Sequence, residues 1–263
     1  MMKYLLFVFL CSISLPLFAQ DSFQLAPPLL KYNSVFFIGK TNLEIKFAQT
    51  GTAVHYTLNG KEPTIKDLVY KRPISVTNNF TSVKAKTFGK AFKPSESVAV
   101  TFIKDGKKIR TVEQTAPNPK YPGSGANTLI DNKGGDAQTN SNTWLGYNCD
   151  TVSITLNLEK EETVNNVLLN FLQNEGGWIF LPEKINVSWF DKTTNSLQYF
   201  GSEAINDDKE TPGSQCNFHI IQPGTKLQTN KIIVQLVVKK KMPAWHSNKG
   251  EHAWMFIDEI KVY

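Results

Sequence analysis

The sequence lacks the short motifs that mark most hydrolases and nucleotide-binding enzymes. It holds no Gly-x-Ser-x-Gly, no His-Glu-x-x-His and no glycine-rich phosphate loop. Its histidines are spread along the chain without metal-ligand spacing, and no Cys-x-x-Cys pair suggests a zinc or redox site. Nor does helix alternate with strand, as a (β/α)8 barrel of about 250 residues requires. We therefore expect that the protein is not an enzyme.

Long apolar runs are absent except at the N-terminus. There Lys3 precedes the run YLLFVFL, and Ala19 offers a small residue for cleavage. The run is shorter than the ~20 residues of a spanning helix, and Pro16 interrupts it. We expect residues 1–20 to be a signal peptide cleaved near residues 19–20, and no later segment to span a membrane. The mature protein is expected to be secreted, periplasmic or at the cell surface.

Cysteine is scarce, and removal of the signal peptide leaves only Cys149 and Cys216. An oxidising compartment permits these two residues to form a disulfide. The sequence does not show whether their Cα atoms lie within bonding range. Two buried free thiols are the alternative.

Charge is distributed unevenly, and arginine is absent from residues 119–263. Residues 26–104 carry twelve Lys/Arg against four Asp/Glu, whereas residues 119–263 carry thirteen Lys against sixteen Asp/Glu. A basic module can attract nucleic acid. These lysines are scattered along alternating strands, however, and export argues against that ligand. We expect a solvated lysine-rich face and no nucleic acid.

Short strands follow one another from residue 35 to residue 104. In the segment AVHYTLN, Val54, Tyr56 and Leu58 fall on one side, a period of two that is typical of half-buried strands. At least five such segments, with no helical period among them, predict a small antiparallel sandwich over residues 26–104. The polar, proline-containing residues 105–118 that follow predict a linker.

A second module is predicted over residues 119–263. Its strands are expected at 151–158, 164–173, 185–190, 197–200, 231–238 and 254–263. The segment 164–173 also suits a short helix, but its β-branched start favours a strand. Long loops separate the strands, notably 174–184 and 239–253, and loops on a rigid sandwich commonly carry binding sites.

One stretch of the first module resembles a known family. YTLNGKEPTIKDLVYKRPISV, followed by Lys84-Ala85-Lys86, resembles the small immunoglobulin-like domain that follows the catalytic barrel in bacterial chitobiases and β-N-acetylhexosaminidases. The resemblance covers about residues 26–104. It implies an accessory module without catalytic residues.

The second module resembles the discoidin-like domain of coagulation factors V and VIII and carbohydrate-binding module family 32. The likeness rests on YPGSGANTLIDNKGG, TWLGY, NEGGWIFLPEKINVS and PAWHSNKGEHAWMFIDEI. It is greatest for copies at the C-termini of family 20 glycoside hydrolases from Bacteroidetes-type bacteria. The expected fold class is all-β, a small immunoglobulin-like sandwich followed by a discoidin-like jelly-roll sandwich.

Family 20 enzymes use an adjacent Asp-Glu pair, and this chain has Asp258-Glu259 near its end. The pair falls in a predicted strand, where neighbouring side chains point to opposite faces. We therefore expect the two carboxyl groups not to share a pocket.

The resemblance also suggests a sugar site. Trp178 follows two glycines in a predicted loop, and Trp245-His246 lies in the loop 239–253. With Glu183 and Lys249 as partners for hydroxyl groups, these side chains suit a pyranose ring, and we expect the two loops to approach each other. Core packing of the indoles is the alternative. Family members often use an arginine here, which this module lacks.

A single structural Ca²⁺ is implied by the resemblance as well. The loop LIDNKGGDAQTNSNTW and a carboxylate near the C-terminus take the corresponding positions. Asp131 and Glu259 are the expected ligands, with Asp136 as a further candidate, because calcium prefers oxygen ligands. A polar loop closed by hydrogen bonds is the alternative.

These observations predict a non-catalytic exported accessory protein that binds glycans, N-acetylhexosamine-containing ones among the candidates. A protein-binding or surface-adhesion module, and a detached accessory tail of a β-N-acetylhexosaminidase, remain alternatives.

Overall fold

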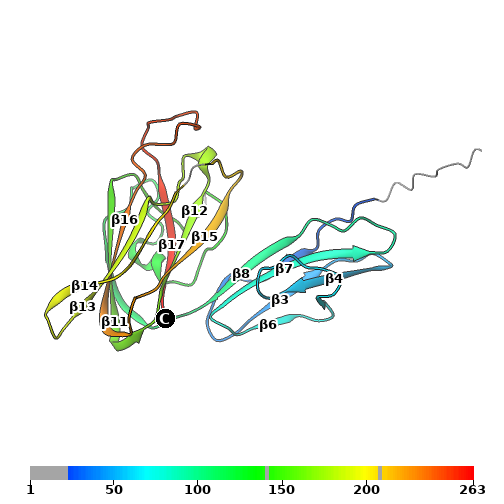
Figure 1. Ribbon diagram of the computed structural model, residues 1–263, viewed down its shortest axis with the longest axis horizontal. Helices are drawn as coiled ribbons and strands as arrows, with labels where there is room; N and C mark the ends of the chain where they lie inside the picture. The colour runs from blue at the N-terminus through cyan, green and yellow to red at the C-terminus, as the bar shows by residue number, and fades with distance from the viewer. Residues whose placement is uncertain (1–22, 140–141, 207–208) are drawn as a thin grey trace, which may run out of the picture.

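The computed structural model describes residues 23–139, 142–206 and 209–263, so the predicted signal peptide lies outside the described residues. Within these ranges the only helical segments are two short 3₁₀ turns, η1 (Gly125–Leu129) and η2 (Glu175–Gly177). None of the described helices is long and apolar enough to cross a membrane. The predicted all-β class is confirmed, as two sandwiches that lie next to each other along the long axis of the molecule (Figure 1).

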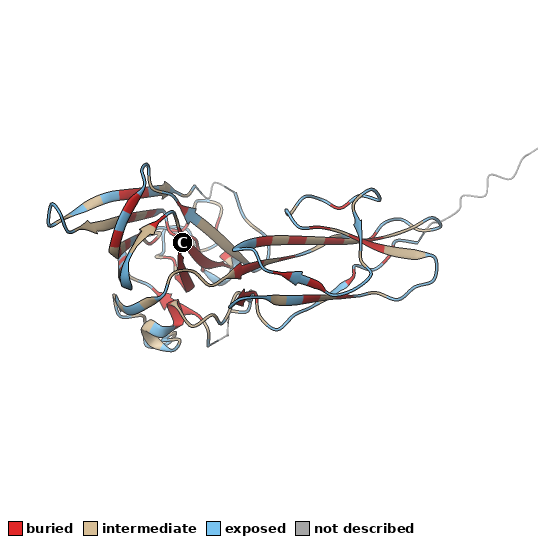
Figure 2. Ribbon diagram, turned by 90° about the horizontal axis from the view of Figure 1, so that it is seen from below, coloured by how far each residue is buried: buried red, intermediate tan, exposed pale blue. Residues whose placement is uncertain are grey.

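The first module consists of a three-stranded sheet, β1-β3-β6, and a five-stranded sheet, β2-β8-β7-β4-β5. Its strands are β1 (Leu29–Lys31), β2 (Phe36–Phe37), β3 (Thr41–Lys46), β4 (Thr52–Thr57), β5 (Leu68–Val69), β6 (Ile74–Val76), β7 (Phe80–Gly89) and β8 (Val98–Lys104). Buried and less buried residues alternate along the longer strands (Figure 2). Val54 is buried as expected, but Leu58 is exposed because β4 ends at Thr57.

The stretch YTLNGKEPT, which carries the resemblance of the first module, has a structural role. Glu62 of the motif forms ion pairs with Lys84 at 2.8 Å and Lys86 at 2.9 Å on β7. These two lysines lower the pKa of the Glu62 carboxyl to about 2. The motif therefore connects a loop to the middle strand of the larger sheet.

The second module also contains two sheets, β10-β17-β12-β15 and β14-β13-β16-β11-β9. Its strands are β9 (Ile109–Gln114), β10 (Leu145–Tyr147), β11 (Thr151–Val164), β12 (Val167–Gln173), β13 (Lys184–Asp191), β14 (Ser196–Ala204), β15 (Gln215–Ile221), β16 (Leu227–Val237) and β17 (Met255–Val262). Their inward side chains form one large apolar core. Segment 164–173 contains strand β12, as predicted.

The prediction that residues 105–118 form a linker is wrong for the middle of this segment. Residues 109–114 form β9, which pairs antiparallel with β11 at the edge of a second-module sheet. An edge strand needs only a few apolar contacts, and here Ile109 and Val112 supply them. The sequence consequently shows no apolar period at this strand. Strand β10 and the first residues of β15 were likewise missed, because the segments 122–150 and 201–217 were expected to be long loops.

Strand β17 contains a bulge at Asp258. Its pairing with β12 passes from Asn170↔Glu259 to Phe171↔Ile257, which leaves Asp258 unpaired. Ile257 and Ile260 both belong to the core. The two residues between them therefore lie on the outer face, and the expectation that Asp258 and Glu259 point to opposite faces is wrong.

The two modules are in direct contact. Phe218 of β15 packs against Phe36 and Phe80 of the first module, with ring centroids 6.5 and 6.3 Å apart. Leu168 of β12 is part of the first module's apolar cluster. The C-terminus lies at this junction (Figure 1). Loop 239–253 lies at the opposite end of the second module, called the distal end below.

Candidate functional site

A tight turn follows β12 at the distal end. Asn174 and Ile179 exchange two backbone hydrogen bonds of 2.9 and 3.0 Å, which close the turn around η2. The Asn174 side chain accepts a further hydrogen bond from the Gly177 N–H at 3.2 Å. These bonds give the turn a defined backbone geometry.

Trp178 ends this turn in a left-handed conformation, with φ of 69°. A bulky residue rarely adopts this region, at a cost on the order of 1 kcal/mol or more. Two backbone hydrogen bonds of 2.8 Å hold it there, from Trp178 N–H to the Glu175 carbonyl and from Trp254 N–H to the Trp178 carbonyl. The residue as a whole is 38% exposed. The turn thus presents an indole to solvent from a fixed backbone.

Glu175 lies beneath the turn with no exposed surface. Its Oε1 accepts a hydrogen bond from Gln173 Nε2 at 2.7 Å, and its Oε2 accepts one from the Thr211 N–H at 2.7 Å. Both carboxylate oxygens are therefore satisfied by neighbouring segments. Sequence reasoning missed this residue, because a glutamate in a polar, glycine-containing loop is normally exposed.

His246 joins the two predicted loops. Its Nδ1 accepts a hydrogen bond from the Asn248 N–H at 3.1 Å, so the ring proton lies on Nε2. That Nε2 donates to the backbone carbonyl oxygen of Glu175 at 3.0 Å. His246 is buried. The expectation that loops 174–184 and 239–253 approach each other is confirmed.

Trp245 packs into a small cluster with Phe180, Met242 and Ala253. Its ring centroid lies 6.0 Å from that of Phe180, and its Nε1 is buried without a hydrogen-bond partner. Residues of the cluster also fix the loop, since Met242 N–H donates to the Glu251 carbonyl at 2.8 Å. Trp245 thus packs within the distal loops, whereas Trp178 is exposed to solvent.

The two predicted polar partners are exposed. Glu183 follows the Trp178 turn and is anchored by its backbone, whose N–H donates to the Val237 carbonyl at 2.8 Å. The Lys249 N–H donates to the His246 carbonyl at 3.1 Å, which places this lysine on the same turn as His246. Both side chains are therefore open to a ligand in the solvent.

Each of the three predicted calcium ligands has a hydrogen-bond partner within the protein. Asp131 and Asp136 each accept a hydrogen bond from a backbone N–H two residues ahead, at 2.9 and 3.0 Å. Glu259 Oε1 lies 2.6 Å from the Nζ of Lys261, and its Oε2 accepts from the Asn132 N–H at 3.1 Å. No three His, Cys, Asp or Glu residues within the described ranges are grouped to hold a metal ion. The residues at Glu259 do not fit Ca²⁺, because an ammonium already lies against the carboxylate.

Asp258 and Glu259 are both fully buried under the loop that contains Asn132 and Gly135. Asp258 accepts hydrogen bonds from the Gly135 N–H at 2.7 Å and from Asn170 Nδ2 at 2.6 Å. Burial raises the pKa of both carboxyl groups, and the Lys261 ammonium opposes the rise for Glu259. The two side chains share a face but not a partner, and neither is open to solvent.

Cys149 and Cys216 are free thiols, so the disulfide does not form. Cys149 follows β10 and Cys216 lies on β15, which are the opposite edges of one four-stranded sheet. Three strand spacings of about 4.8 Å place those edges about 14 Å apart. That separation exceeds the reach of a disulfide.

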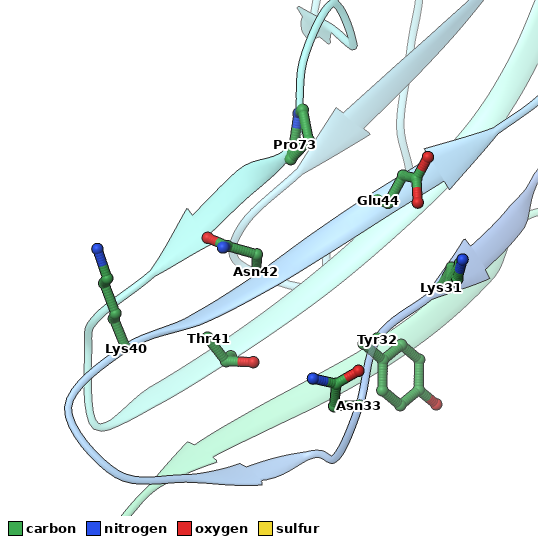
Figure 3. Close-up of a pocket in the computed structure, with 8 residues that line it drawn as sticks. All are labelled: Lys31, Tyr32, Asn33, Lys40, Thr41, Asn42, Glu44 and Pro73. Carbon is green, nitrogen blue, oxygen red and sulfur yellow. The ribbon is translucent and has the colours of Figure 1, made fainter.

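Several cavities lie away from the distal loops. One of about 390 Å³ opens on the first module over β1 and β3, where Asn33, Asn42 and Glu44 line it beside Tyr32 (Figure 3). Another of about 540 Å³ lies between the modules and is lined by residues of both, including Tyr32 and Phe218. Neither contains a residue predicted to bind sugar.

Comparison with known proteins gives a family for the first module. Residues 33–101 match the family described as chitobiase/beta-hexosaminidase C-terminal domain. The resemblance drawn from the motif is therefore confirmed for the first module. No curated protein matches the sequence.

Solved structures similar to the chain include carbohydrate-binding modules. The family 32 module of Streptococcus pneumoniae EndoD is 14% identical, with a TM-score of 0.38, covering 58% of this chain and 94% of the module. Chitosan-binding module 1 of a Paenibacillus sp. IK-5 chitosanase/glucanase is 15% identical, with a TM-score of 0.37, covering 59% and 96%. Residues 33–101 of the first sandwich are thus similar to the chitobiase/beta-hexosaminidase C-terminal domain family, and the chain is also similar in structure to family 32 carbohydrate-binding modules.

Proposed function

We propose that this is an exported, non-catalytic accessory protein that binds glycans through the distal loops of its second module. One observation carries the proposal, the exposed indole of Trp178 on a strained but fully hydrogen-bonded turn. Backbone strain of this kind persists where the surrounding structure imposes it, and it is concentrated at binding sites.

The chemistry around Trp178 suits a sugar. An indole face stacks on the apolar face of a pyranose, and exposed polar groups then fix the hydroxyl groups. Lys249 would supply donors and Glu183 acceptors, since both are exposed on the two distal loops. Residues 119–263 contain no arginine, and Arg110 of the second module lies on β9 rather than in the distal loops, so the donors in these loops come from lysine or amide groups.

N-acetylhexosamine-containing glycans are the ligands that we propose to test first, on analogy with the enzymes that carry the first module's family. A surface with one exposed indole offers little enclosed area. We expect a dissociation constant on the order of 10⁻⁴ to 10⁻³ M, about 4 to 5.5 kcal/mol.

A glycan array followed by NMR titration of the mature protein tests this proposal. Trp178→Ala should weaken binding at least tenfold, about 1.4 kcal/mol, without lowering the melting temperature. Tyr199→Ala is the matched control, because Tyr199 is a 72% exposed aromatic residue on β14, outside the two loops. Equal losses in both variants, or no glycan bound by the wild type at 10 mM, would refute the proposal (concentration chosen about tenfold above the weakest expected constant).

The non-catalytic part of the proposal has its own test. Purified protein should not hydrolyse a chromogenic N-acetylglucosaminide. Turnover that disappears in Glu259→Gln, at unchanged stability, would show that the buried carboxyl pair is catalytic after all.

Export is tested by the mature N-terminus. Intact-mass analysis of protein recovered outside the cytoplasm should show loss of the first 19 or 20 residues. Recovery of the full-length chain in the cytoplasm alone would contradict export.

A protein-binding role is the second candidate, and a feature of the first module favours it. A cavity of about 570 Å³ lies beside β4 and is lined by apolar groups that include Ile65 and Phe88. Leu68 and Val69 on the neighbouring edge strand β5 are also exposed. Contiguous exposed apolar surface commonly marks a protein contact. Pull-down that is lost in Ile65→Ser but retained in Trp178→Ala would support this role.

A further inference from the structure

The side chain of Lys261 lies at the junction of the two modules. It projects from β17 with 3% of its surface exposed. Its Nζ lies 2.6 Å from Glu259 Oε1, 2.7 Å from Asn132 Oδ1 and 3.1 Å from Asp105 Oδ1. An ammonium has three N–H donors, and these three oxygens satisfy all of them.

The three oxygens belong to separate parts of the chain. Glu259 lies on β17, Asn132 in the loop after η1, and Asp105 in the segment that leaves β8 of the first module. Asn132 has a left-handed backbone, with φ of 58°, which lets its N–H bind Glu259 while its side chain binds Lys261. The Lys261 ammonium therefore links three parts of the chain: the loop after η1, strand β17 and the segment that connects the two modules.

The first module also contacts this cation directly. The Lys261 Nζ lies 5.8 Å from the ring centroid of Phe36 on β2, within cation–π range. The Asp105 N–H donates to the Phe37 carbonyl at 2.8 Å, and the Tyr263 hydroxyl donates to the Lys104 carbonyl at 2.5 Å. Gly135 lies so close to Val35 that a side chain there would collide with it. Lys261 therefore lies beside a closely packed interface between the two modules.

We infer that the Lys261 ammonium is a built-in cation, which occupies the place that the family resemblance assigns to Ca²⁺ and locks the two modules together. A buried carboxylate such as Glu259 needs a positive partner, and a fixed lysine provides one without a metal ion. Ca²⁺ needs six to eight oxygens, whereas Glu259 Oε1, Asn132 Oδ1 and Asp105 Oδ1 are already bound to the ammonium, and Glu259 Oε2 to the Asn132 N–H. The protein should therefore be indifferent to calcium, and its modules should unfold together.

Thermal unfolding of the mature two-module protein tests this inference, in 2 mM CaCl₂ and in 2 mM EDTA (concentrations about twentyfold above a 10⁻⁴ M calcium site). The wild type should give the same single transition in both buffers. Lys261→Met removes the charge at similar length, and should lower the transition in EDTA by more than about 5 °C or split it into two. Calcium should recover part of that loss, because the variant leaves Asp105, Asn132 and Glu259 without a cation.

Lys192→Met is the matched control. Lys192 pairs with Glu161 at 2.9 Å in the same module, but both side chains are about half exposed. Its loss should leave the transition within about 2 °C of the wild type in both buffers. A wild-type melting temperature that rises with calcium, or a Lys261→Met protein that melts like the control, would overturn the inference.

An NMR measurement on the wild type tests the inference even if the Lys261→Met variant does not fold. Lysine ammonium protons exchange with water too fast to be observed unless they are buried and hydrogen-bonded. The folded wild type should therefore show one protected ammonium signal at neutral pH, and Lys261→Arg should remove it. Absence of a protected signal from the folded wild type would contradict the geometry by itself.

Discussion

The imidazole Nε2 of His246 donates a hydrogen bond of 3.0 Å to the backbone carbonyl oxygen of Glu175. This bond joins the two distal loops through residues that are 71 positions apart in sequence. It also fixes the carbonyl that receives the Trp178 N–H. The orientation of the exposed indole therefore depends on a buried histidine that contacts it only through the backbone.

Replacing this histidine should loosen the site without removing any exposed group. His246→Ala should reduce glycan affinity severalfold and lower the unfolding free energy by about 1–3 kcal/mol, because a buried carbonyl loses one partner. NMR titration and urea denaturation measure the two effects. His219→Ala, at a half-buried histidine on β15, is the control for affinity. Wild-type affinity in His246→Ala would show that the indole does not need the bond between loops.

The carboxylate of Glu175 should matter for stability more than an exposed glutamate nearby. Glu175→Gln keeps the shape but turns an NH₂ group toward a donor, either Gln173 Nε2 or the Thr211 N–H. We expect a loss of about 1–3 kcal/mol in urea denaturation. Glu183→Gln should stay within about 0.5 kcal/mol of the wild type. A similar change in both variants would mean that the buried network contributes nothing.

The ion pairs of Glu62 should stabilise the first module in a defined pH range. Its pKa is lowered from 4.5 to about 2, so the unfolded chain binds the proton more readily than the folded one. The stabilisation is therefore complete above pH 4.5 and disappears as the pH falls towards 2.

Since Glu62 is about half exposed, solvent screening limits the contribution to about 0.2–1 kcal/mol. Glu62→Gln should melt slightly earlier than the wild type at pH 6, with a difference that vanishes near pH 2. NMR titration of the Glu62 carboxyl carbon gives the midpoint directly. A midpoint near 4.5 would contradict the ion pairs with Lys84 and Lys86.

The two cysteines should remain reduced and should differ in reactivity. Burial raises the pKa of the Cys216 thiol to about 12, so its reactive thiolate is rare at pH 8. The pKa of Cys149 is also raised, but Cys149 is less buried. Alkylation of the native protein should therefore modify Cys149 first, as peptide mapping would show. An intact mass 2 Da below that of the reduced chain (two protons lost on oxidation) would reveal a disulfide and contradict the sheet geometry.

The sequence by itself determined the all-β class, the two modules and most of their strands. These features depend on local alternation of apolar residues and on motif residues that contact each other within one module, such as Glu62 and Lys84. It also indicated the distal loops, because a tryptophan after two glycines in a polar segment favours exposure. Such signals lie within a single strand, loop or motif, and the sequence therefore contains them directly.

Tertiary structure alone decided the features that depend on distant partners. Strand β9 exists because β11 offers it an edge, although its own residues are mostly polar. The bulge at Asp258 arises from pairing with β12 and turns both carboxyl groups to one face. Glu175 and Lys261 look like exposed residues in the sequence, but they are buried because oxygens or N–H groups far along the chain satisfy their charges. The sequence around a charged residue does not show which distant groups will pair with it. The cost of burying the charge is offset only when the fold brings those partners together.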